Sequence, residues 1–356
     1  MDRDHATDGH RGFRKLKSRL PTNKYPSLST PQPAPFRRGC ALAKALFSIG
    51  YLGNDENPGT PVGVCMIVCM APTIPLPDAR SFATLVTDVR PGRLSPDAEA
   101  TARNDSGGVR DLGHYVRPNT LSDAVAALQA RPGMRILAGG TDVYPMLGDA
   151  VRDADLLDIT GVSGLREITS GPEGIRIGAL ATWTDVQRAD LGSGFRALQE
   201  AGREVGSPQI QNAATVAGNV CNASPAADGT AALLALGAEV EVVGPAGTRR
   251  VALADFVTGV RQVALAPAEI VSALHLPPHA GLSAFVKLGA RKYLVISIAM
   301  VAAHVARDAQ GRIARAAVAV GSCAPVARRQ RALEAALIGA RADDLADAVR
   351  PDLLEG

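Results

Sequence analysis

The sequence is poor in cysteine, and the cysteines that it has are scattered. Five occur in 356 residues, an odd number that argues against a disulfide framework and indicates a reducing compartment. Cys65 and Cys69 lie four residues apart, but no second cysteine pair or histidine cluster joins them, so a zinc site is not expected. The spacing that iron–sulfur clusters require is absent throughout. Any such cluster that serves this protein therefore belongs to another chain.

The sequence also lacks a segment typical of export or membrane insertion. The first 20 residues are charged and contain no apolar core of a signal peptide. The longest apolar run, near residues 62–71, is too short to span a bilayer. These absences predict a cytoplasmic protein without a membrane span.

Charge of one sign is not in excess. Lysine plus arginine number 38 and aspartate plus glutamate 35, a net charge of +3, so the chain as a whole is not expected to bind nucleic acid. A basic cluster within residues 11–24 is interpreted as a flexible tail. The six histidines show no metal-ligand spacing, and we predict no metal site.

Proline is unevenly distributed and divides the chain at about residue 112. Residues 1–112 contain 12 of the 24 prolines and show weak amphipathic periodicity, which is typical of a disordered segment. We therefore predict a Pro-rich, disordered extension over residues 1–112, followed by folded domains. An added tail and an early start codon, with Met66 or Met70 as the alternative start, both account for this extension.

From residue 113 onwards the pattern indicates helices and strands. Thr120 and Asp123 form a capping box before a helix with an apolar face that includes Val125 and Leu128. Strands and helices follow without regular βαβ alternation, which predicts an α+β fold rather than a Rossmann sheet. The expected strands are 134–138, 155–159, 174–183, a hairpin at 239–244 and 246–253, a strand through Phe285 and Lys287, and an antiparallel pair at 295–306 and 314–322; further helices are expected at 184–191, 195–205, 230–237 and 328–338.

Two stretches of small residues stand out. Residues 138–142 (AGGTD) and 215–219 (TVAGN) can each present consecutive backbone N–H groups, with a threonine hydroxyl as a further donor. Glycine permits positive φ and leaves room for a large anion such as a diphosphate. Neither stretch is a GxGxxG or Walker motif, and a single Gly-Gly pair is most often a turn. Two such stretches flanking one α+β unit indicate a dinucleotide site, because both can face the same diphosphate.

Five motifs carry a resemblance to a known family. They are AGGTD, DITGVSGLREI, IRIGALATWTDV, QIQNAATVAGNVCNASPAADG and AFVKLGAR. In this order and spacing, the chain resembles the FAD-binding (medium) subunits of the molybdenum hydroxylases, which include the xanthine dehydrogenase and carbon monoxide dehydrogenase flavoprotein subunits. The resemblance extends from about residue 115 to 340. It implies FAD as the cofactor and a two-subdomain fold of the vanillyl-alcohol-oxidase (PCMH) type, followed by a small α+β C-terminal domain.

The resemblance also implies domain limits. An FAD-binding domain is expected over residues 113–280, with subdomains at about 113–170 and 171–280. The C-terminal domain is expected over residues 281–356. Because the chain ends at Gly356, before the usual end of this domain in the family, we expect the domain to be incomplete.

By the same resemblance, residues 138–142 and 215–219 are the two diphosphate segments. Asp228 matches a carboxylate that bonds to the ribityl or neighbouring hydroxyls, and Ser224 lies in the same turn. Lys287 matches a lysine near the cofactor, where a positive charge favours reduced, anionic flavin. No catalytic residue is expected. The expected cofactor-binding residues are Ala138, Gly139, Gly140, Thr141, Asp142, Thr215, Ala217, Gly218, Asn219, Ser224, Asp228 and Lys287.

Two of these assignments have structural alternatives, and two other positions differ from the family pattern. Asp228 can simply cap the helix that follows it, and Lys287 can be a solvated strand residue. The family commonly has arginine at Gln211 and glycine at Ala217, so this chain lacks a charge and gains a methyl group. Trp183, Cys221 and His304 are interpreted as core or structural residues, and Tyr144 packs either on the core or on the cofactor.

The implied function is electron transfer. Similar subunits pass electrons from iron–sulfur clusters through FAD to NAD or a quinone-type acceptor, together with a molybdenum-cofactor large subunit and an iron–sulfur small subunit. We expect such a chain alone not to oxidise the primary substrate. Two alternatives stay open: a self-sufficient FAD-dependent oxidoreductase of related fold, and a degenerate, non-enzymatic FAD-binding scaffold. Flavin content separates the scaffold from both enzymes, and co-purified partners separate the complex from the lone enzyme.

Overall fold

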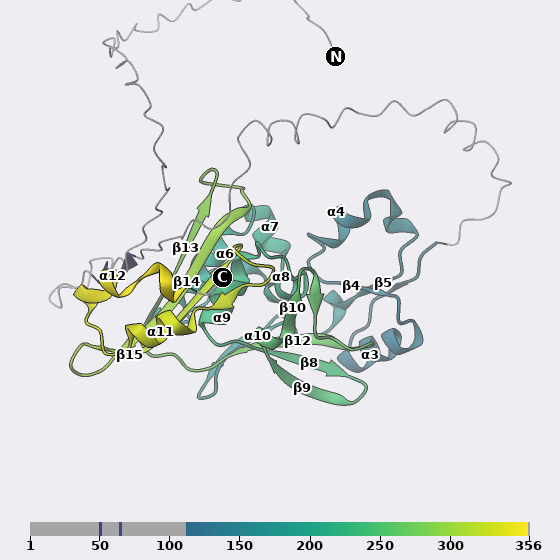
Figure 1. Ribbon diagram of the computed structural model, residues 1–356. Coiled ribbons are helices and arrows are strands. Elements are labelled where there is room, and N and C mark those ends of the chain that lie inside the picture. Colours follow the sequence, from purple (N-terminus) through teal and green to yellow (C-terminus); the bar gives the residue numbers. More distant parts are fainter. Residues whose placement is uncertain (1–49, 52–63, 66–111, 355–356) are drawn as a thin grey trace, which may run out of the picture. The chain divides into compact units, whose positions relative to one another are not determined.

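The computed structural model describes residues 50–51, 64–65 and 112–354, all within one compact unit, Ala43–Gly356. The predicted Pro-rich extension lies outside the described residues, apart from Leu112 and two short strands, β1 (Gly50–Tyr51) and β2 (Val64–Cys65), which pair antiparallel. From residue 112 the chain forms three larger sheets with helices packed against them (Figure 1). None of the helices in the described part of the chain is long and apolar enough to cross a membrane.

The first sheet is parallel and leads into the first glycine stretch. Its strands lie in the order β3-β5-β4. Helix α3 begins as predicted, because the Thr120 hydroxyl accepts a hydrogen bond from the Asp123 N–H at 3.1 Å. Its apolar face buries Val125 and Leu128. The elements are β3 (Tyr115–Val116), α3 (Leu121–Ala130), β4 (Arg135–Leu137), α4 (Val143–Leu147), β5 (Leu156–Asp158) and the 3-10 helices Gly148–Arg152 and Ile159–Gly161.

The second sheet is antiparallel, with five strands in the order β6-β7-β12-β8-β9. The predicted β8–β9 hairpin is confirmed, with Gly244 opposite Gly247 at its turn. A smaller hairpin, β10–β11, follows it. The strands are β6 (Ile168–Gly171), β7 (Gly174–Gly178), β8 (Glu239–Gly244), β9 (Gly247–Ala252), β10 (Val257–Gly259), β11 (Gln262–Val263) and β12 (Ile270–Leu276). The helices are α5 (Trp183–Arg188), 3-10 helix Ser193–Phe195, α6 (Arg196–Glu204), α7 (Pro208–Ala213), α8 (Val216–Cys221), α9 (Asp228–Ala235) and α10 (Leu253–Phe256).

The third sheet has four antiparallel strands in sequence order, and it includes the predicted pair β14–β15. The predicted helix at 328–338 is wrong at its start. Arg328 and Arg329 form strand β16 opposite β15, and helix α11 begins only at Arg331. The elements are β13 (Leu282–Gly289), β14 (Ser297–Arg307), β15 (Ile313–Gly321), β16 (Arg328–Arg329), α11 (Arg331–Leu337), 3-10 helix Ala342–Asp344, α12 (Leu345–Ala348) and 3-10 helix Pro351–Leu353.

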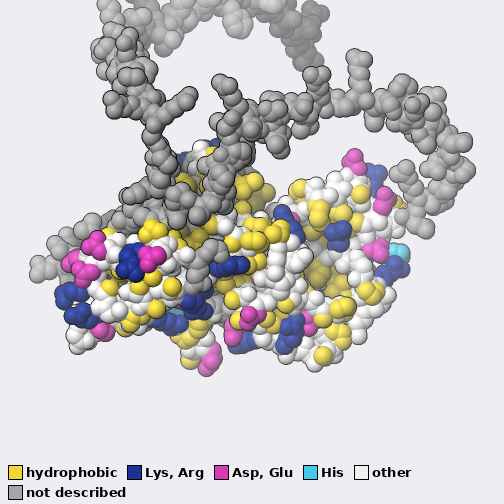
Figure 2. Space-filling view, viewed as in Figure 1, with side chains coloured by type: hydrophobic (Ala, Val, Ile, Leu, Met, Phe, Trp, Pro, Cys, Tyr) yellow, Lys and Arg dark blue, Asp and Glu magenta, His cyan; other side chains and the backbone are white. Residues whose placement is uncertain are grey.

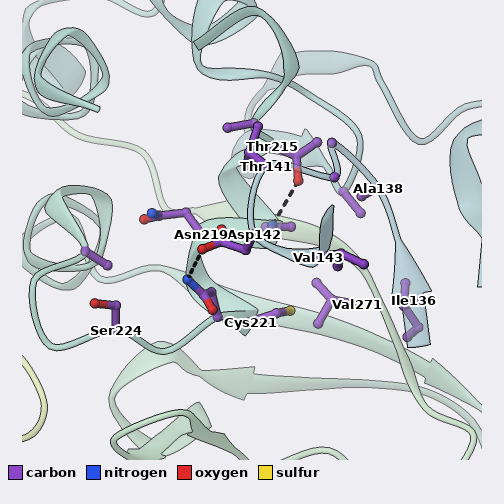
Figure 3. A pocket seen from close by; sticks show the side chains of 18 of the residues that line it. Ile136, Ala138, Thr141, Asp142, Val143, Thr215, Asn219, Cys221, Ser224 and Val271 are labelled. Carbon is purple, nitrogen blue, oxygen red and sulfur yellow. Dashed lines mark hydrogen bonds between the residues drawn. The ribbon is translucent and has the colours of Figure 1, made fainter. Parts of the chain in front are cut away.

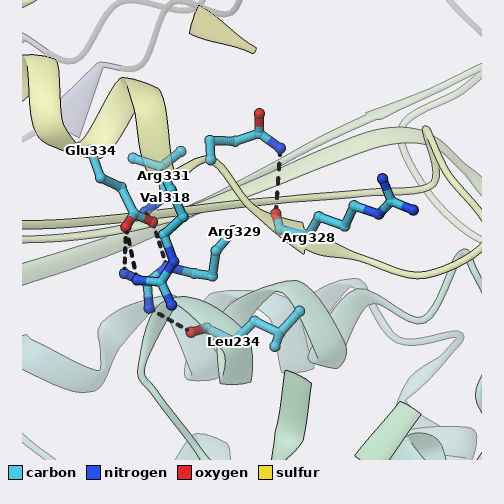
Figure 4. Close-up of polar contacts among 7 residues, drawn as sticks. Leu234, Val318, Arg328, Arg329, Arg331 and Glu334 are labelled. Carbon is cyan, nitrogen blue, oxygen red and sulfur yellow. Dashed lines mark hydrogen bonds and ion pairs between the residues drawn. The ribbon is translucent and has the colours of Figure 1, made fainter. Parts of the chain in front are cut away.

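A buried carboxylate explains the late start of α11 (Figure 4). Glu334 accepts hydrogen bonds from the Arg329 guanidinium and from the Val318 N–H at 2.9 Å. Arg329 also donates to the carbonyl of Leu234, in α9, at 3.3 Å. An extended backbone at Arg329 lets the guanidinium reach both partners, so pairing with β15 overrides the helical propensity of these residues.

One large core joins the second and third sheets through α5, α6 and α9. Trp183 is fully buried in it, together with Phe256 and Leu274. Helices α6 and α9 lie against β13 and β14 (Figure 1). On the face seen in Figure 2, acidic and basic side chains intermingle over the described residues.

Candidate functional site

A cavity of about 500 Å³ lies among the loop after β4, helix α8 and strand β12. Its volume is within the range typical of small-molecule sites. Both glycine stretches line it, and so does Ser224. Figure 3 shows the polar side chains of Thr141, Thr215 and Asn219 grouped apart from the apolar Ile136 and Val271. The structure therefore brings together two stretches that are far apart in sequence, as predicted.

The loop at residues 138–142 is shaped by contact with helix α7. A Cβ atom at Gly139 would lie 2.0 Å from the carbonyl oxygen of Ala213, so only glycine fits there. Gly140 has a φ of 72°, in the left-handed region that favours glycine. Within the described residues, the N–H groups of residues 139–142 make no hydrogen bond to protein. The loop therefore presents a row of free donors suited to an anion.

The stretch at residues 215–219 forms the start of helix α8. Thr215 is its N-cap, and the Thr215 hydroxyl accepts a hydrogen bond from the Gly218 N–H at 2.9 Å. The N–H groups of Val216 and Asn219 are bonded to main-chain carbonyls. Among the described residues the Ala217 N–H has no partner of its own, so this stretch offers fewer free amides than an open loop. A Cβ at Gly218 would lie 2.7 Å from the Thr215 hydroxyl oxygen, which explains the glycine.

Asn219 connects the cavity with a second hollow of about 420 Å³. Asn219 and Ser224 line both spaces. The Oδ1 atom of Asn219 is buried and has no hydrogen-bond partner. A buried acceptor without a partner is costly, which suggests that a donor from a ligand completes it. The residues at the cavity therefore fit a dinucleotide, with free donors along one wall and this acceptor between the two spaces.

Asp228 and Lys287 line the second hollow as a buried ion pair. Lys287 Nζ lies 2.7 Å from Asp228 Oδ2, and the Ser297 hydroxyl donates to Asp228 Oδ1 at 2.6 Å. Burial raises the pKa of the Asp228 carboxyl above its ordinary value, while the bonds from Lys287 and Ser297 oppose that shift. The Asp228 side chain makes no capping bond although it begins α9, so the capping alternative is wrong. The solvated alternative for Lys287 is also wrong, because its side chain is only 7% exposed.

The two departures from the family pattern have local explanations. Gln211 is buried; its side-chain amide donates to the carbonyl of Arg203 at 3.1 Å and accepts from Gln187 at 3.1 Å. Ala217 lies in α8 and does not have a positive φ, so its methyl group is accommodated without strain. Neither residue disturbs the walls of the cavity.

The residues interpreted as structural behave accordingly. Trp183 is fully buried, and the His304 ring bonds through Nε2 to the carbonyl of Ala280 at 3.0 Å. Burial raises the pKa of the Cys221 thiol to about 12, which makes it unreactive. Tyr144 is 52% exposed and its ring lies beside Gly140, away from the core.

Two residues at the site were not anticipated from the sequence. Arg261 lines the cavity, and Ser297 holds Asp228. Asn222, which lies within one of the quoted motifs, also lines the cavity. Arg261 and Ser297 come from separate segments, so only tertiary structure brings them to the site. The one available signal was the short turn at residues 260–261, which places a basic side chain at the tip of a hairpin.

Comparisons with known proteins agree with this geometry. A sequence profile of the FAD binding domain in molybdopterin dehydrogenase matches residues 108–279. The xanthine dehydrogenase FAD-binding subunit of Escherichia coli O157:H7 is 36% identical over 224 residues, 60% of this chain and 75% of that protein. The nicotinate dehydrogenase FAD-subunit of Eubacterium barkeri is 36% identical over 193 residues, 52% of this chain and 65% of that protein.

A solved structure supports the same relationship. The carbon monoxide dehydrogenase from Hydrogenophaga pseudoflava matches with a TM-score of 0.62 and 28% sequence identity, over 70% of this chain and 89% of the matched chain. The fold is thus the α+β, PCMH-type FAD-binding fold that the sequence predicted, and the cofactor is FAD. The chain belongs to the FAD-binding (medium) subunits of the molybdenum hydroxylase family.

Proposed function

We propose that this chain receives electrons from the iron–sulfur clusters of a partner and passes them through FAD to NAD or a quinone-type acceptor. The observation that carries the proposal is the pair of adjoining spaces: a cavity with free N–H groups at 139–142, and a hollow with the buried Asp228–Lys287 pair. A dinucleotide needs donors for its diphosphate and a separate place for its ring system. FAD supplies the redox chemistry when bound.

Several of the expected site residues have a direct role in this proposal. The N–H groups of residues 139–142, the Thr141 hydroxyl and the Ala217 N–H donate to the diphosphate. Asn219 accepts a hydrogen bond from the cofactor through its free Oδ1. Because Asp228 balances the charge of Lys287 at 2.7 Å, the pair presents a dipole rather than a full positive charge. It therefore favours an anionic flavin less strongly than an unpaired lysine would.

The partners follow from what the relatives are. The names "FAD-binding subunit" and "FAD-subunit" each describe one component of a larger dehydrogenase. We infer a molybdenum-cofactor large subunit and an iron–sulfur small subunit as partners of this chain. The scaffold alternative loses two of its arguments, because Gln211 and Ala217 both fit the fold without closing the cavity.

The first test is the absorption spectrum of the purified full chain, with the released cofactor identified by chromatography. We expect a flavin spectrum and FAD. A colourless protein that also takes up no added FAD would overturn the site assignment.

The second test separates a subunit from a self-sufficient enzyme. The FAD-loaded chain alone is mixed with a purine or an aldehyde and an artificial electron acceptor. We expect no turnover until the two partner subunits are added. Turnover by the chain alone would favour the self-sufficient oxidoreductase.

A further inference from the structure

Arg261 lies at the tip of the β10–β11 hairpin, beside the cavity, in an unusual backbone conformation. Its φ is 58°, a left-handed value that is unfavourable for arginine. Its N–H donates to the carbonyl of Ala223 at 2.9 Å, and Ala223 also has a positive φ, 45°. Two residues with positive φ are therefore joined directly, and one of them, Arg261, lines the cavity. Backbone strain of this kind is concentrated at functional sites.

The guanidinium of Arg261 is only partly engaged by protein. Its Nη1 donates to the carbonyl and to the side-chain oxygen of Asn222. The Asn222 amide in turn donates to Asp142 Oδ1 at 2.8 Å, so three segments around the cavity are connected. Within the described residues, Nε and Nη2 of Arg261 have no hydrogen-bond partner. These two donors remain free for a ligand.

The charged side chains that line the cavity show why the free donors of Arg261 matter for a ligand. Among the described residues that line it, Asp142 and Arg261 are the charged ones, and the others are apolar or neutral. Free N–H groups offer dipoles to a diphosphate but do not neutralise its charge. A guanidinium fork matches phosphate oxygens in both charge and geometry.

We propose that Arg261 is a further cofactor-binding residue, which supplies positive charge that offsets part of the negative charge of the diphosphate of the bound dinucleotide. Its strained backbone fixes the guanidinium at the edge of the cavity, and its contact with Asn222 orients it. The inference rests on the proposed function, because it takes the cavity as the diphosphate site.

The test measures FAD binding to the flavin-free full chain by quenching of flavin fluorescence, at low and at high salt. At low salt, Arg261→Gln is expected to weaken binding roughly ten- to hundredfold, the loss typical for a charged hydrogen bond. Salt weakens binding to the wild type, since it screens the charge pair, and has little effect on the variant. Arg261→Lys is expected to retain the salt dependence with intermediate affinity.

Two further variants separate charge from structure. Arg250→Gln removes a half-exposed arginine of β9 that does not line the cavity, and it is expected to bind FAD as the wild type does. Asn222→Ala keeps the charge of Arg261 but removes its side-chain contact, so salt dependence should persist. If Arg261→Gln shows the same salt dependence as the wild type, the charge role is overturned, whatever the affinity. If the wild type itself takes up no FAD, the proposed function falls first.

Discussion

At Gly139 the loop after β4 lies against the last turn of α7. The absent Cβ leaves the Ala213 carbonyl oxygen in the space that a side chain would occupy. The sequence pattern predicted glycine here as room for a diphosphate, yet the contact seen is with the protein's own backbone. Gly139 therefore acts on the site indirectly: it lets two distant segments approach closely enough to share one cavity.

This contact leads to a prediction at residue scale. Gly139→Ala should lower the free energy of unfolding by about 3 kcal/mol, the upper range for forcing extra volume into a packed site, and should weaken FAD binding. Thermal unfolding and flavin titration measure both effects. Gly133→Ala is the matched control, because nothing lies within 4 Å of its added Cβ. Equal stability and equal FAD affinity of the two variants would contradict the prediction.

At the scale of the element, capping and periodicity patterns in the sequence can predict the start of a helix when a side chain caps it. Thr120 caps α3 as its sequence position suggests. Thr182 caps α5, although it lies in the segment 174–183 that was predicted to be a strand; that strand ends at Gly178. The same patterns missed that Thr215 caps α8, because a six-residue helix has too few residues to show periodicity. They also placed the start of α11 too early, since the pairing of Arg329 with β15 is non-local.

The candidate site likewise combines segments that sequence motifs indicated with contacts between residues far apart in the sequence. Motif spacing indicated the segments at 138–142 and 215–219, and the structure places both on one cavity. The Lys287–Asp228 pair joins residues 59 positions apart, and Arg261 reaches Asn222 across 39. Such contacts depend on sheet topology, which periodicity and capping patterns do not encode.

The Glu334 carboxylate leads to a prediction about helix α11. Burial raises the pKa of the Glu334 carboxyl, but hydrogen bonds from the Arg329 guanidinium and the Val318 N–H lower it by more than burial raises it. The pKa of Glu334 therefore lies below its ordinary value. Glu334→Gln should cost about 1.5–3 kcal/mol in urea unfolding, because the Arg329 guanidinium, which is only 17% exposed, loses its charged partner. Glu239→Gln is the control: its carboxylate is 48% exposed and 3.8 Å from Arg250, so the expected change is below about 0.5 kcal/mol. Similar losses in both variants would contradict the role of Glu334.

At the scale of the whole described region, two histidines lie where the second and third sheets meet. His279, in the connection between β12 and β13, packs against His304 of β14 with ring centroids 4.4 Å apart and the ring planes tilted by 51°. Each ring bonds to a carbonyl through Nε2, and each Nδ1 is buried without a partner. Burial lowers the pKa of His279, and burial together with His279 lowers that of His304 to about 4. The positive charges of Arg315 and Arg329 lower the pKa values of both histidines further.

The lowered pKa values predict acid sensitivity with a definite sign. The unfolded chain binds protons near the ordinary pKa of 6.5 and the folded chain only near 4, so stability is full above pH 6.5 and falls as the pH is lowered. Between pH 6.5 and 5, His304 alone should account for a loss of about 1.6 kcal/mol. The free energy of unfolding, measured across this pH range, should depend less on pH in His304→Gln than in the wild type. This substitution keeps a donor for the Ala280 carbonyl. An unchanged slope in that variant would contradict the prediction.

The shared wall formed by Asn219 and Ser224 has a consequence for ligand binding. These side chains border both the cavity and the second hollow, so one orientation of the Asn219 amide must serve both spaces. A molecule that bonds to the Asn219 amide in one space therefore fixes it for the other space as well, and we expect the two affinities to be coupled. Thermodynamic linkage makes this coupling reciprocal. The adenosine-bearing and ring-bearing halves of a cut dinucleotide, added together, should therefore bind non-additively.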